Sequence, residues 1–323
     1  MAQGPTVTML GGGVGCSRLA VPLAAELGSG DLTLVINTAD DLWRYGLRIC
    51  PDIDTNLYAL AGLQDRVSGW GLAGDTFRAM DRLRELGEDP WFNLGDLDLA
   101  THILRTELLD KLSLTEVTAE MTRRLAINTR VLPMTDSEVS TVLTTASGTY
   151  SFQEWFVKLR AGGPLEQVRY EGIERAEATP EVIRAIVDAD LVVIAPSNPV
   201  VSIEPILAMP AIRDLLIARR SSVVAVTPII SAVPIVSDGE AHRARARKEQ
   251  MQARGLVHEA SAVACLYKQL AGTFVLDRAD AVQRSSIEVN DQRVELADTI
   301  ISDDESGRRL VAVLLALPAL RAF

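Results

Sequence analysis

The chain has 323 residues, of which 48% are hydrophobic and 23% charged, which is usual for a globular protein of one large domain or two smaller ones. Its formal net charge of −11 argues against nucleic acid or an anionic membrane as the principal partner. The three cysteines lack metal-site spacing, and no apolar run approaches the roughly 18 residues of a membrane-spanning helix. Since the N-terminus also lacks a signal-peptide pattern, we expect a cytoplasmic protein with reduced thiols.

The first elements predict a βαβ unit. Residues 6–10 form a short β-prone run that ends in glycines, residues 17–27 carry leucines at helical spacing, and residues 32–36 are typical of a buried parallel strand. A right-handed crossover should join the two strands. Because ligands bind at the carboxyl ends of such strands, the glycine turn at 11–15 and the polar segment at 37–41 should share one edge of the sheet.

Helical spacing then dominates up to about residue 128, and strand-like segments return after it. We interpret the chain as a single α/β domain, a Rossmann-like three-layer sandwich with a largely parallel sheet. A helical insertion should occupy about 56–128, and a mainly helical C-terminal extension, which includes a basic run at 242–254, should occupy about 238–323. Strands are predicted at 130–132, 139–144, 149–152, 191–195, 222–226 and 273–276, and helices at 75–86, 97–109, 115–125, 181–188 and from about 306.

The glycine turn does not match the common dinucleotide-binding pattern, because Cys16 stands where the last glycine should be, and it lacks the lysine of a P-loop. Glycines nevertheless allow backbone N–H groups to approach a phosphate at the N-terminus of a helix, where the helix dipole favours anions. We therefore favour a phosphate or diphosphate cradle over a purely structural turn. Its expected members are Gly12, Gly13, Val14 and Gly15.

Four carboxylates follow the second strand: Asp40, Asp41, Asp52 and Asp54. One acid would suffice to bind a dinucleotide ribose, whereas several suit a hard cation. Magnesium usually takes one or two carboxylates and completes its shell with water and phosphate oxygens. We therefore expect a hard cation such as Mg²⁺ near these acids, and we favour a functional role for Asp40 and Asp54. Asp41 and Asp52 remain open between substrate binding and helix capping or solvated loop positions.

Two further segments carry candidate site residues. The turn between Pro196 and Pro199 presents Ser197 and Asn198, whose short polar side chains would suit a base or phosphate, although capping of a helix is the alternative. Asp96 and His102 lie at the start of a probable helix, where capping or packing is again the alternative. The sequence shows neither a histidine cluster typical of zinc sites nor a Gly-x-Ser-x-Gly motif of serine hydrolases.

As an ordered set, these segments resemble the 2-phospho-L-lactate transferase family, whose members act in coenzyme F420 biosynthesis and include mycobacterial enzymes that use an enolpyruvyl substrate. The resemblance runs from about residue 6 to residue 240. Beyond the glycine turn, it rests on NTADDLWRYGLRICPDIDT at 37–55, GWGLAGDTF at 69–77, LGDLDLATHILRT at 94–106, LPMTDSEVST at 132–141, FQEWFV at 152–157, APSNPVVSI at 195–203 and TPIISAVPI at 227–235.

The resemblance implies Mg²⁺-dependent transfer of a phospholactyl or phosphoenolpyruvyl group from a guanosine-diphosphate-linked donor to the ribityl hydroxyl of the deazaflavin Fo (7,8-didemethyl-8-hydroxy-5-deazariboflavin), with release of GMP. It implies that Asp40 and Asp54 are the catalytic and metal-binding residues, with Asp54 orienting or deprotonating the hydroxyl, and that the protein is a homodimer. It places Ser197 and Asn198 with the guanosine diphosphate. Other expected substrate-binding residues are Asn37, Thr38, Trp43, Thr55 and Pro228.

The sequence departs from the family pattern at three places. Val14 replaces a threonine of the glycine loop, Leu97 replaces an arginine, and 231–233 lacks the glycine that often follows Pro-Ile-Ile. Two other interpretations compete with this one: a non-enzymatic nucleotide-sugar-binding regulator from a related glycine-loop family, and an NAD-dependent dehydrogenase, which the failed glycine spacing weakens. The donor acid stays open between lactate, enolpyruvate and glycerate, because pockets discriminate such groups by only ~1–3 kcal/mol.

Overall fold

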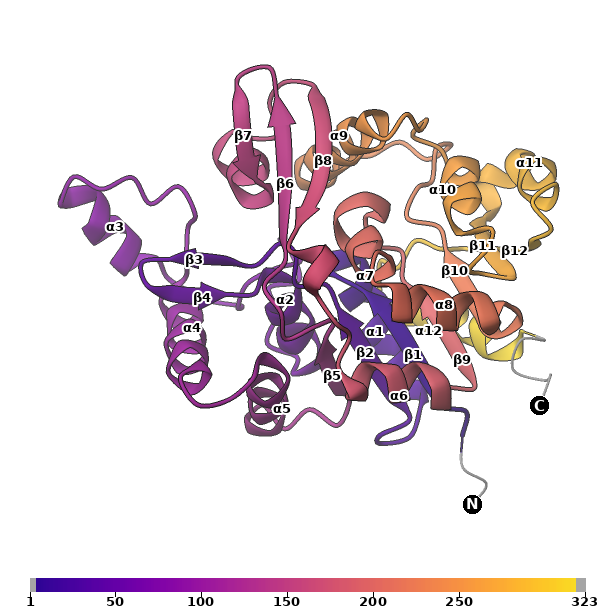
Figure 1. Cartoon of the computed structure of the whole chain (residues 1–323), viewed down its shortest axis with the longest axis horizontal. Coiled ribbons are helices and arrows are strands. Elements are labelled where there is room, and N and C mark those ends of the chain that lie inside the picture. The colour runs from indigo at the N-terminus through magenta and orange to yellow at the C-terminus, as the bar shows by residue number, and fades with distance from the viewer. Residues whose placement is uncertain (1–3, 318–323) are drawn as a thin grey trace.

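The computed structural model describes residues 4–317. Its centre is a seven-stranded sheet in which every pair of neighbouring strands is parallel, in the order β12-β11-β10-β9-β1-β2-β5 (Figure 1). The strands are β1 (Val7–Gly11), β2 (Leu32–Ile36), β5 (Arg130–Pro133), β9 (Leu191–Ile194), β10 (Val223–Val226), β11 (Thr273–Asp277) and β12 (Arg293–Ala297).

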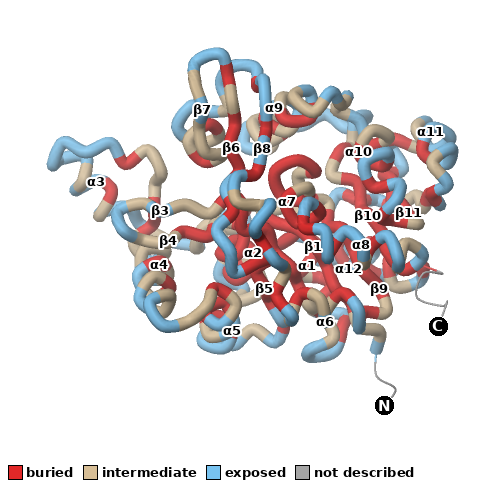
Figure 2. Tube along the Cα trace, in the orientation of Figure 1, coloured by how far each residue is buried: buried red, intermediate tan, exposed pale blue. Residues whose placement is uncertain are grey.

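Helices cover both faces of this sheet. Successive strand residues point to opposite faces, so that the neighbours Val192 and Val193 of β9 belong to different hydrophobic cores. Figure 2 shows the sheet as the buried centre of the molecule. The three-layer α/β sandwich is therefore confirmed. One face is covered by α1 (Gly13–Glu26), α2 (Pro51–Leu60), α5 (Leu114–Arg124) and α12 (Asp304–Ala316), and the other by α6 (Pro180–Asp188), α7 (Glu204–Leu207), α8 (Pro210–Ala218) and α10 (Ala260–Tyr267).

The strand order reverses between β1 and β9. The chain first runs outward from β1 through β2 to β5, and it then returns to β9 and runs outward on the other side through β10, β11 and β12. In open α/β sheets, ligands bind in the crevice beyond the carboxyl ends of the strands at this reversal point. The glycine turn directly follows β1 and the Pro196–Pro199 turn directly follows β9, so the topology itself brings these two motifs together.

Several elements extend beyond the carboxyl edge of the sheet (Figure 1). The hairpin β3 (Leu42–Arg44) and β4 (Leu47–Ile49) packs on α4 (Asp96–Leu109). A separate antiparallel sheet has the order β7-β6-β8, and α9 (Asp238–Ala253) lies beside β8. The remaining elements are α3 (Arg78–Glu85), β6 (Ser140–Thr145), β7 (Gly148–Ser151), β8 (Leu165–Glu171) and α11 (Arg284–Glu288), with short helical segments at Glu154–Lys158, Ile173–Arg175, Pro199–Ile203, Arg220–Ser222 and Arg278–Gln283.

The predicted elements lie close to their expected bounds, whereas the β3–β4 hairpin, β8 and β12 have no counterpart in the prediction. The strand predicted at 32–36 has those bounds, and the helix predicted at 17–27 begins earlier, at Gly13, because the glycine turn forms its first turn. The prediction that 273–276 is the final strand is wrong, since β12 follows it and pairs with β11. In β12, exposed and buried residues mix, so this edge strand lacks the apolar run that marked the others.

The division into an insertion and a C-terminal extension stays a prediction, and residues 318–323 of that extension lie outside the described residues. Within the predicted insertion, α5 packs on β5 and contributes to the same core as α1 and α2. Between residues 4 and 317, no helix combines the length and the apolar character needed to cross a membrane.

Candidate active site

A cavity of about 840 Å³ lies at the reversal point of the sheet. The glycine turn, α2, the Pro196–Pro199 turn and α9 line it, together with loop residues around Trp70 and Trp91. Most of the site residues predicted from the sequence line this cavity. They are Gly12, Gly13, Val14, Gly15, Asp40, Asp52, Asp54, Thr55, His102, Ser197, Asn198 and Pro228.

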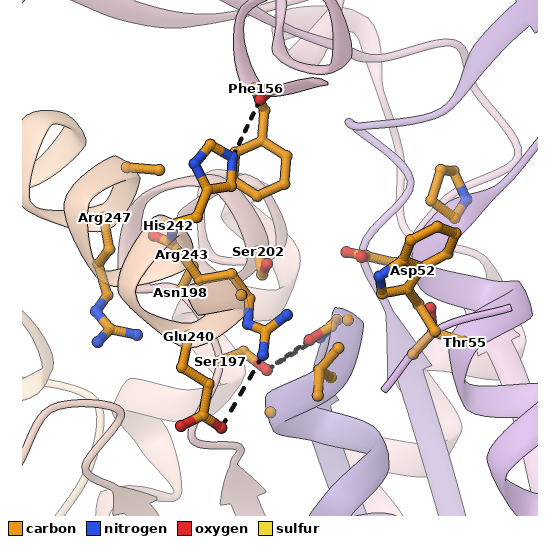
Figure 3. Close-up of a pocket in the computed structure, with 18 of the residues that line it drawn as sticks. Asp52, Thr55, Phe156, Ser197, Asn198, Ser202, Glu240, His242, Arg243 and Arg247 are labelled. Carbon is orange, nitrogen blue, oxygen red and sulfur yellow. Dashed lines mark hydrogen bonds and ion pairs between the residues drawn. The ribbon is translucent and has the colours of Figure 1, made fainter. Parts of the chain in front are cut away.

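Close packing joins the glycine turn to the Pro196–Pro199 turn. The backbone N–H of Gly12 donates to Oγ of Ser197 at 3.2 Å, and the Ser197 hydroxyl donates to the carbonyl of Gly12 at 2.8 Å (Figure 3). A Cβ atom at Gly15 would lie 2.1 Å from the carbonyl oxygen of Pro196, well inside van der Waals contact. The glycines therefore let the N-terminus of α1 pack directly on the loop that follows β9.

Substitution of Gly15 by alanine should destabilise the protein by about 1–3 kcal/mol, because the new methyl group meets backbone that cannot rotate away. Gly239→Ala is the matched control, since the nearest atoms to a Cβ there are 3.8 Å away and the residue lies in the first turn of α9. Urea unfolding would compare the two variants. Equal stability of Gly15→Ala and the parent protein would contradict the close approach.

The carboxylate of Asp52 occupies the N-terminal end of α1. Its Oδ2 would lie 2.0 Å from a Cβ at Gly12, and it accepts a hydrogen bond from Nδ2 of Asn37 at 3.0 Å. The dipole of α1 favours an anion at this position. The anion nearest the glycine turn is thus one of the protein's own side chains, so an incoming phosphate needs a further positive charge beside it.

Buried acidic side chains crowd this end of the cavity. Burial, and then the charge of Asp52, raise the pKa of Asp40 well above its ordinary value. Burial and the charge of Asp41 raise the pKa of Asp52 to about 7, although the hydrogen bond from Asn37 lowers it. Oδ1 of Asp40 is buried without a hydrogen-bond partner among the described residues. An unpaired buried carboxylate beside a second one is an arrangement that fits a divalent cation.

The stability of the metal-free protein should therefore fall as the pH rises from about 4 to 8. The pKa is about 7 for Asp52 and about 6 for Asp41, where the effect of burial outweighs that of the nearby Arg48. Because the ordinary value is 3.8, the folded state binds more protons than the unfolded state in this pH window. A cation would replace those protons. Mg²⁺ should raise Tm more at pH 8 than at pH 5, which thermal unfolding with Mg²⁺ or with EDTA would measure. An equal or larger Mg²⁺ effect at pH 5 would contradict this account.

A buried charged network holds Asp54 on α2 against α4. The guanidinium of Arg105 contacts both carboxylate oxygens of Asp54, with Nη1 3.0 Å from Oδ2. His102 lies between Arg105 and Asp98, with Nε2 3.1 Å from Oδ2 of Asp98 and Nδ1 3.2 Å from Nη1 of Arg105. The hydroxyl of Tyr58 donates to Asp98 at 2.5 Å. Positions 98, 102 and 105 share one face of the helix, which aims all three side chains at α2.

This network bears on the predicted metal ligands. Ligand atoms of Asp54, Asp98 and His102 lie within 4.8 Å of one another, which would suit a metal ion by distance alone. The Arg105 cation already occupies the same cluster, and its positive charge opposes a second cation there. Asp40, whose carboxylate has no such partner, is therefore the better supported of the two predicted ligands, and the role of Asp54 stays a prediction.

Five predicted site residues do not line the cavity. Asn37 holds Asp52, Thr38 is buried, and Asp41 pairs with Arg48 at 3.1 Å. The remaining two are Trp43, which is 53% exposed on β3, and Asp96, which accepts hydrogen bonds from the backbone N–H groups of Arg78 and Ala79. Asp96 thus caps the N-terminus of α3, whereas the sequence placed it at the start of the helix that is now α4.

The three departures from the family pattern also have places in the structure. Val14 lines the cavity, whereas Leu97 is exposed and does not. In the segment 231–233, the backbone N–H groups of Ser231 and Ala232 donate to Asp280 at 2.7 and 3.0 Å, and Val233 lines the cavity.

Sequence reasoning missed two groups that complete the wall. One is aromatic: Phe152 stacks on Phe156 with ring centroids 5.2 Å apart, and Phe156 lies 4.6 Å from the ring of His242 (Figure 3). The other is basic, with Arg243 and Arg247 on α9 (Figure 3). The basic run at 242–254 was visible in the sequence, but nothing in it indicated which residues face inward. Trp70, Trp91, Phe92 and Arg18 also line the cavity.

The fold and the site define a Rossmann-like α/β protein whose cavity offers carboxylates, arginines and aromatic rings to one ligand or a pair of ligands. Such a cavity suits an anionic, ring-containing substrate together with a cation. Residues 7–311 match the model of the family described as 2-phospho-L-lactate transferase CofD, and the chain belongs to this family.

Curated relatives agree with this assignment over nearly the whole chain. The chain is 37% identical to a 2-phospho-L-lactate transferase from Methanosarcina acetivorans, over 96% of its own length and 98% of the relative's. It is 36% identical to a phosphoenolpyruvate transferase from Mycolicibacterium smegmatis, again over 96% and 98% of the two chains. The protein is thus a transferase of this family, and the regulator and dehydrogenase interpretations are disfavoured.

A solved structure supports the fold independently. The crystal structure of a protein of the UPF0052 family from Bacillus halodurans superimposes with a TM-score of 0.64, over 98% of this chain and 100% of that one. The two sequences are only 15% identical, so this similarity concerns the fold alone.

Proposed function

We propose that the protein transfers a phospholactyl or phosphoenolpyruvyl group from a guanosine-diphosphate-linked donor to the terminal ribityl hydroxyl of the deazaflavin Fo, in coenzyme F420 biosynthesis. The hydroxyl oxygen forms a bond to the outer phosphorus, the bond from that phosphorus to the bridging oxygen breaks, GMP leaves with the electron pair, and the hydroxyl proton is released. The observation that carries the proposal is the cavity at the strand reversal, where buried carboxylates face arginines and aromatic rings in a chain of this family.

Mg²⁺ is the proposed cofactor, with Asp40 and Asp54 as its predicted ligands and Asp52 as a further carboxylate that could face it. The unpartnered Oδ1 of Asp40 and the raised pKa values of Asp40 and Asp52 support a cation there. When bound, Mg²⁺ would supply charge neutralisation between these carboxylates and the donor phosphates.

The residues of the chain would mainly orient the two substrates, since phosphoryl transfer depends on positioning and charge stabilisation. The aromatic side chains of Phe152, Phe156 and Trp91 give a planar deazaflavin apolar surface on which to stack. Arg105 holds the Asp54 carboxylate in one orientation. This fixed orientation suits the role proposed for Asp54, which is to orient the attacking hydroxyl or to accept its proton. Ser197 and Asn198 are proposed to contact the guanosine diphosphate.

The relatives do not distinguish the donor acid, because enzymes of both named activities are similar to the chain to nearly the same degree. The direct experiment supplies Fo and Mg²⁺ with the lactyl, enolpyruvyl or glyceryl diphosphoguanosine in turn, and identifies the product by mass spectrometry. We expect a phosphodiester of Fo from at least one donor. No product from any of the three, together with tight UDP-sugar binding, would replace the transferase proposal by the regulator interpretation.

A cytoplasmic location and a homodimeric assembly also stay proposals. Cys16 and Cys50 are buried free thiols, which suits a reducing compartment. Size-exclusion chromatography with light scattering would test the assembly.

A further inference from the structure

We propose that Arg18, Arg243 and Arg247 form an oxyanion subsite that receives the diphosphate of the donor nucleotide. This inference rests on the proposed function for the identity of the nucleotide, but not for the chemistry of the subsite. It gives a role to the basic run of α9, in which no site residue was predicted from the sequence.

The three arginines converge on one wall of the cavity. Arg243 and Arg247 are one helical turn apart on α9, and Arg18 reaches the same wall from α1. In Figure 3, Arg243 extends from α9 toward Ser197, across the cavity from Asp52. The cavity therefore has an acidic wall and a basic wall that face each other.

Positive charge is in excess on the basic wall. Within residues 4–317, Glu240 is the carboxylate that contacts these arginines, at 2.8 Å from Arg18 and 4.0 Å from Arg243. Nε of Arg247 donates to Nε2 of His258 at 3.0 Å, and burial, followed by the nearby arginine, lowers the pKa of His258 to about 4, which leaves the imidazole neutral at pH 7. Two of the three cations thus share one anion, and within residues 4–317 no carboxylate contacts Arg247, in a protein whose formal net charge is −11.

Burial and this excess of positive charge lower the pKa values of two of these arginines. Burial, followed by the charge of Arg243, lowers the pKa of Arg247 to about 10, and burial, followed by Arg18, lowers that of Arg243. Like charges held together in a partly buried wall are unfavourable until an anion enters. Guanidinium groups can bind phosphate oxygens with two parallel hydrogen bonds, which suits a diphosphate.

The glycine turn offers less to a diphosphate than its sequence suggested. The N–H of Gly12 already donates to Ser197, and the carboxylate of Asp52 lies against the same residue. The arginine wall is the alternative source of positive charge. It is also tied to the predicted nucleotide loop, because Nδ2 of Asn198 donates to Oε1 of Gln250 on α9 at 2.6 Å.

Isothermal titration calorimetry with GDP, GMP and inorganic pyrophosphate tests the proposal on the intact protein. Since each guanidinium would make charge-assisted hydrogen bonds to phosphate oxygens, Arg243→Ala and Arg247→Ala should each weaken GDP and pyrophosphate binding by about tenfold or more. The effect on GMP should be smaller. Arg245→Ala is the matched control, because Arg245 is exposed on the same helix and does not line the cavity. Circular dichroism would establish that each variant is folded.

The outcomes separate this inference from the proposed function. Arginine-dependent binding of pyrophosphate without any preference for guanosine nucleotides would support the subsite and count against the proposed donor. GDP and pyrophosphate affinities that match those of the parent protein in both variants would overturn the subsite, and so would a parent protein that binds neither. If the variants kept the GDP affinity but bound the complete donor more weakly, the arginines would contact the carboxylate of the donor's lactate, enolpyruvate or glycerate. That result would also overturn the diphosphate subsite.

Discussion

Replacement of Asp40 by asparagine is expected to lower the rate of Fo-dependent GMP release by about 1,000-fold or more while the protein stays folded. The substitution keeps the shape of the side chain but removes its charge, so the proposed cation loses a ligand. The same change removes a buried charge that Asp52 repels, and the metal-free variant should therefore unfold at a higher temperature than the parent protein.

Enzyme assays and thermal unfolding in EDTA would measure both effects on the same preparation. Asp214→Asn is the matched control, because Asp214 is exposed on α8 and remote from the cavity wall. If Asp40→Asn kept more than a tenth of the parent rate, Asp40 would not hold the proposed cation. If its metal-free form unfolded at a lower temperature, the account of charge repulsion between Asp40 and Asp52 would be wrong.

Asp54→Asn, which the sequence alone makes the obvious choice, is a less clean experiment. Asp54 is the anionic partner of the buried Arg105, so its neutralisation leaves a buried guanidinium without a counter-charge. Loss of activity in that variant would combine an effect on the reaction with an effect on folding.

Replacement of Arg105 by alanine is expected to destabilise the protein by about 3–5 kcal/mol, because it leaves Asp54 buried and unpaired. Arg105 is 1% exposed, so water cannot replace the lost guanidinium without opening the contact between α2 and α4. Urea unfolding would measure the loss. The charged network around Asp54 is thus predicted to be a large determinant of stability as well as part of the site.

The control for this prediction is Arg123→Ala on α5. Arg123 pairs with Glu120 at 2.7 Å, but this pair is exposed and solvent-screened, so its loss should destabilise the protein far less than the loss of Arg105. Equal destabilisation by the two substitutions would contradict the view that Asp54 depends on Arg105. A double variant with leucine at both Asp54 and Arg105 should recover much of the stability, because it removes both buried charges.

The central fold could be predicted from the sequence because its strands are buried on both faces. β2, β9 and β10 are nearly continuous apolar runs, and short runs of this kind are typical of strands in a parallel sheet that is covered on both faces. The meeting of the glycine turn with Ser197 followed from the same pattern, since both come directly after a buried strand. By contrast, the three-residue strands of the β3–β4 hairpin are too short for any periodicity to appear.

The candidate site could be predicted only in part. The acidic segments made Asp40 and Asp54 the favoured candidates and left Asp52 open, but Arg105 is 51 residues from Asp54 along the chain, and no local pattern indicates that they pair. On α9, basic residues occur on several faces, and only the packing against β8 decides that Arg243 and Arg247 face the cavity while Arg245 faces solvent. Tertiary contacts, rather than motifs, therefore determine both of these features.

The central claim is that the protein joins the phosphorylated acid of the donor to Fo in a reaction that needs a divalent cation. The most direct measurement quantifies GMP and the Fo phosphodiester in the same reaction, with Mg²⁺ or with EDTA, and with or without Fo. We predict one GMP for each phosphodiester, and neither product when Fo or Mg²⁺ is absent. GMP release at the same rate without Fo, or phosphodiester formation at an undiminished rate in EDTA, would contradict the account.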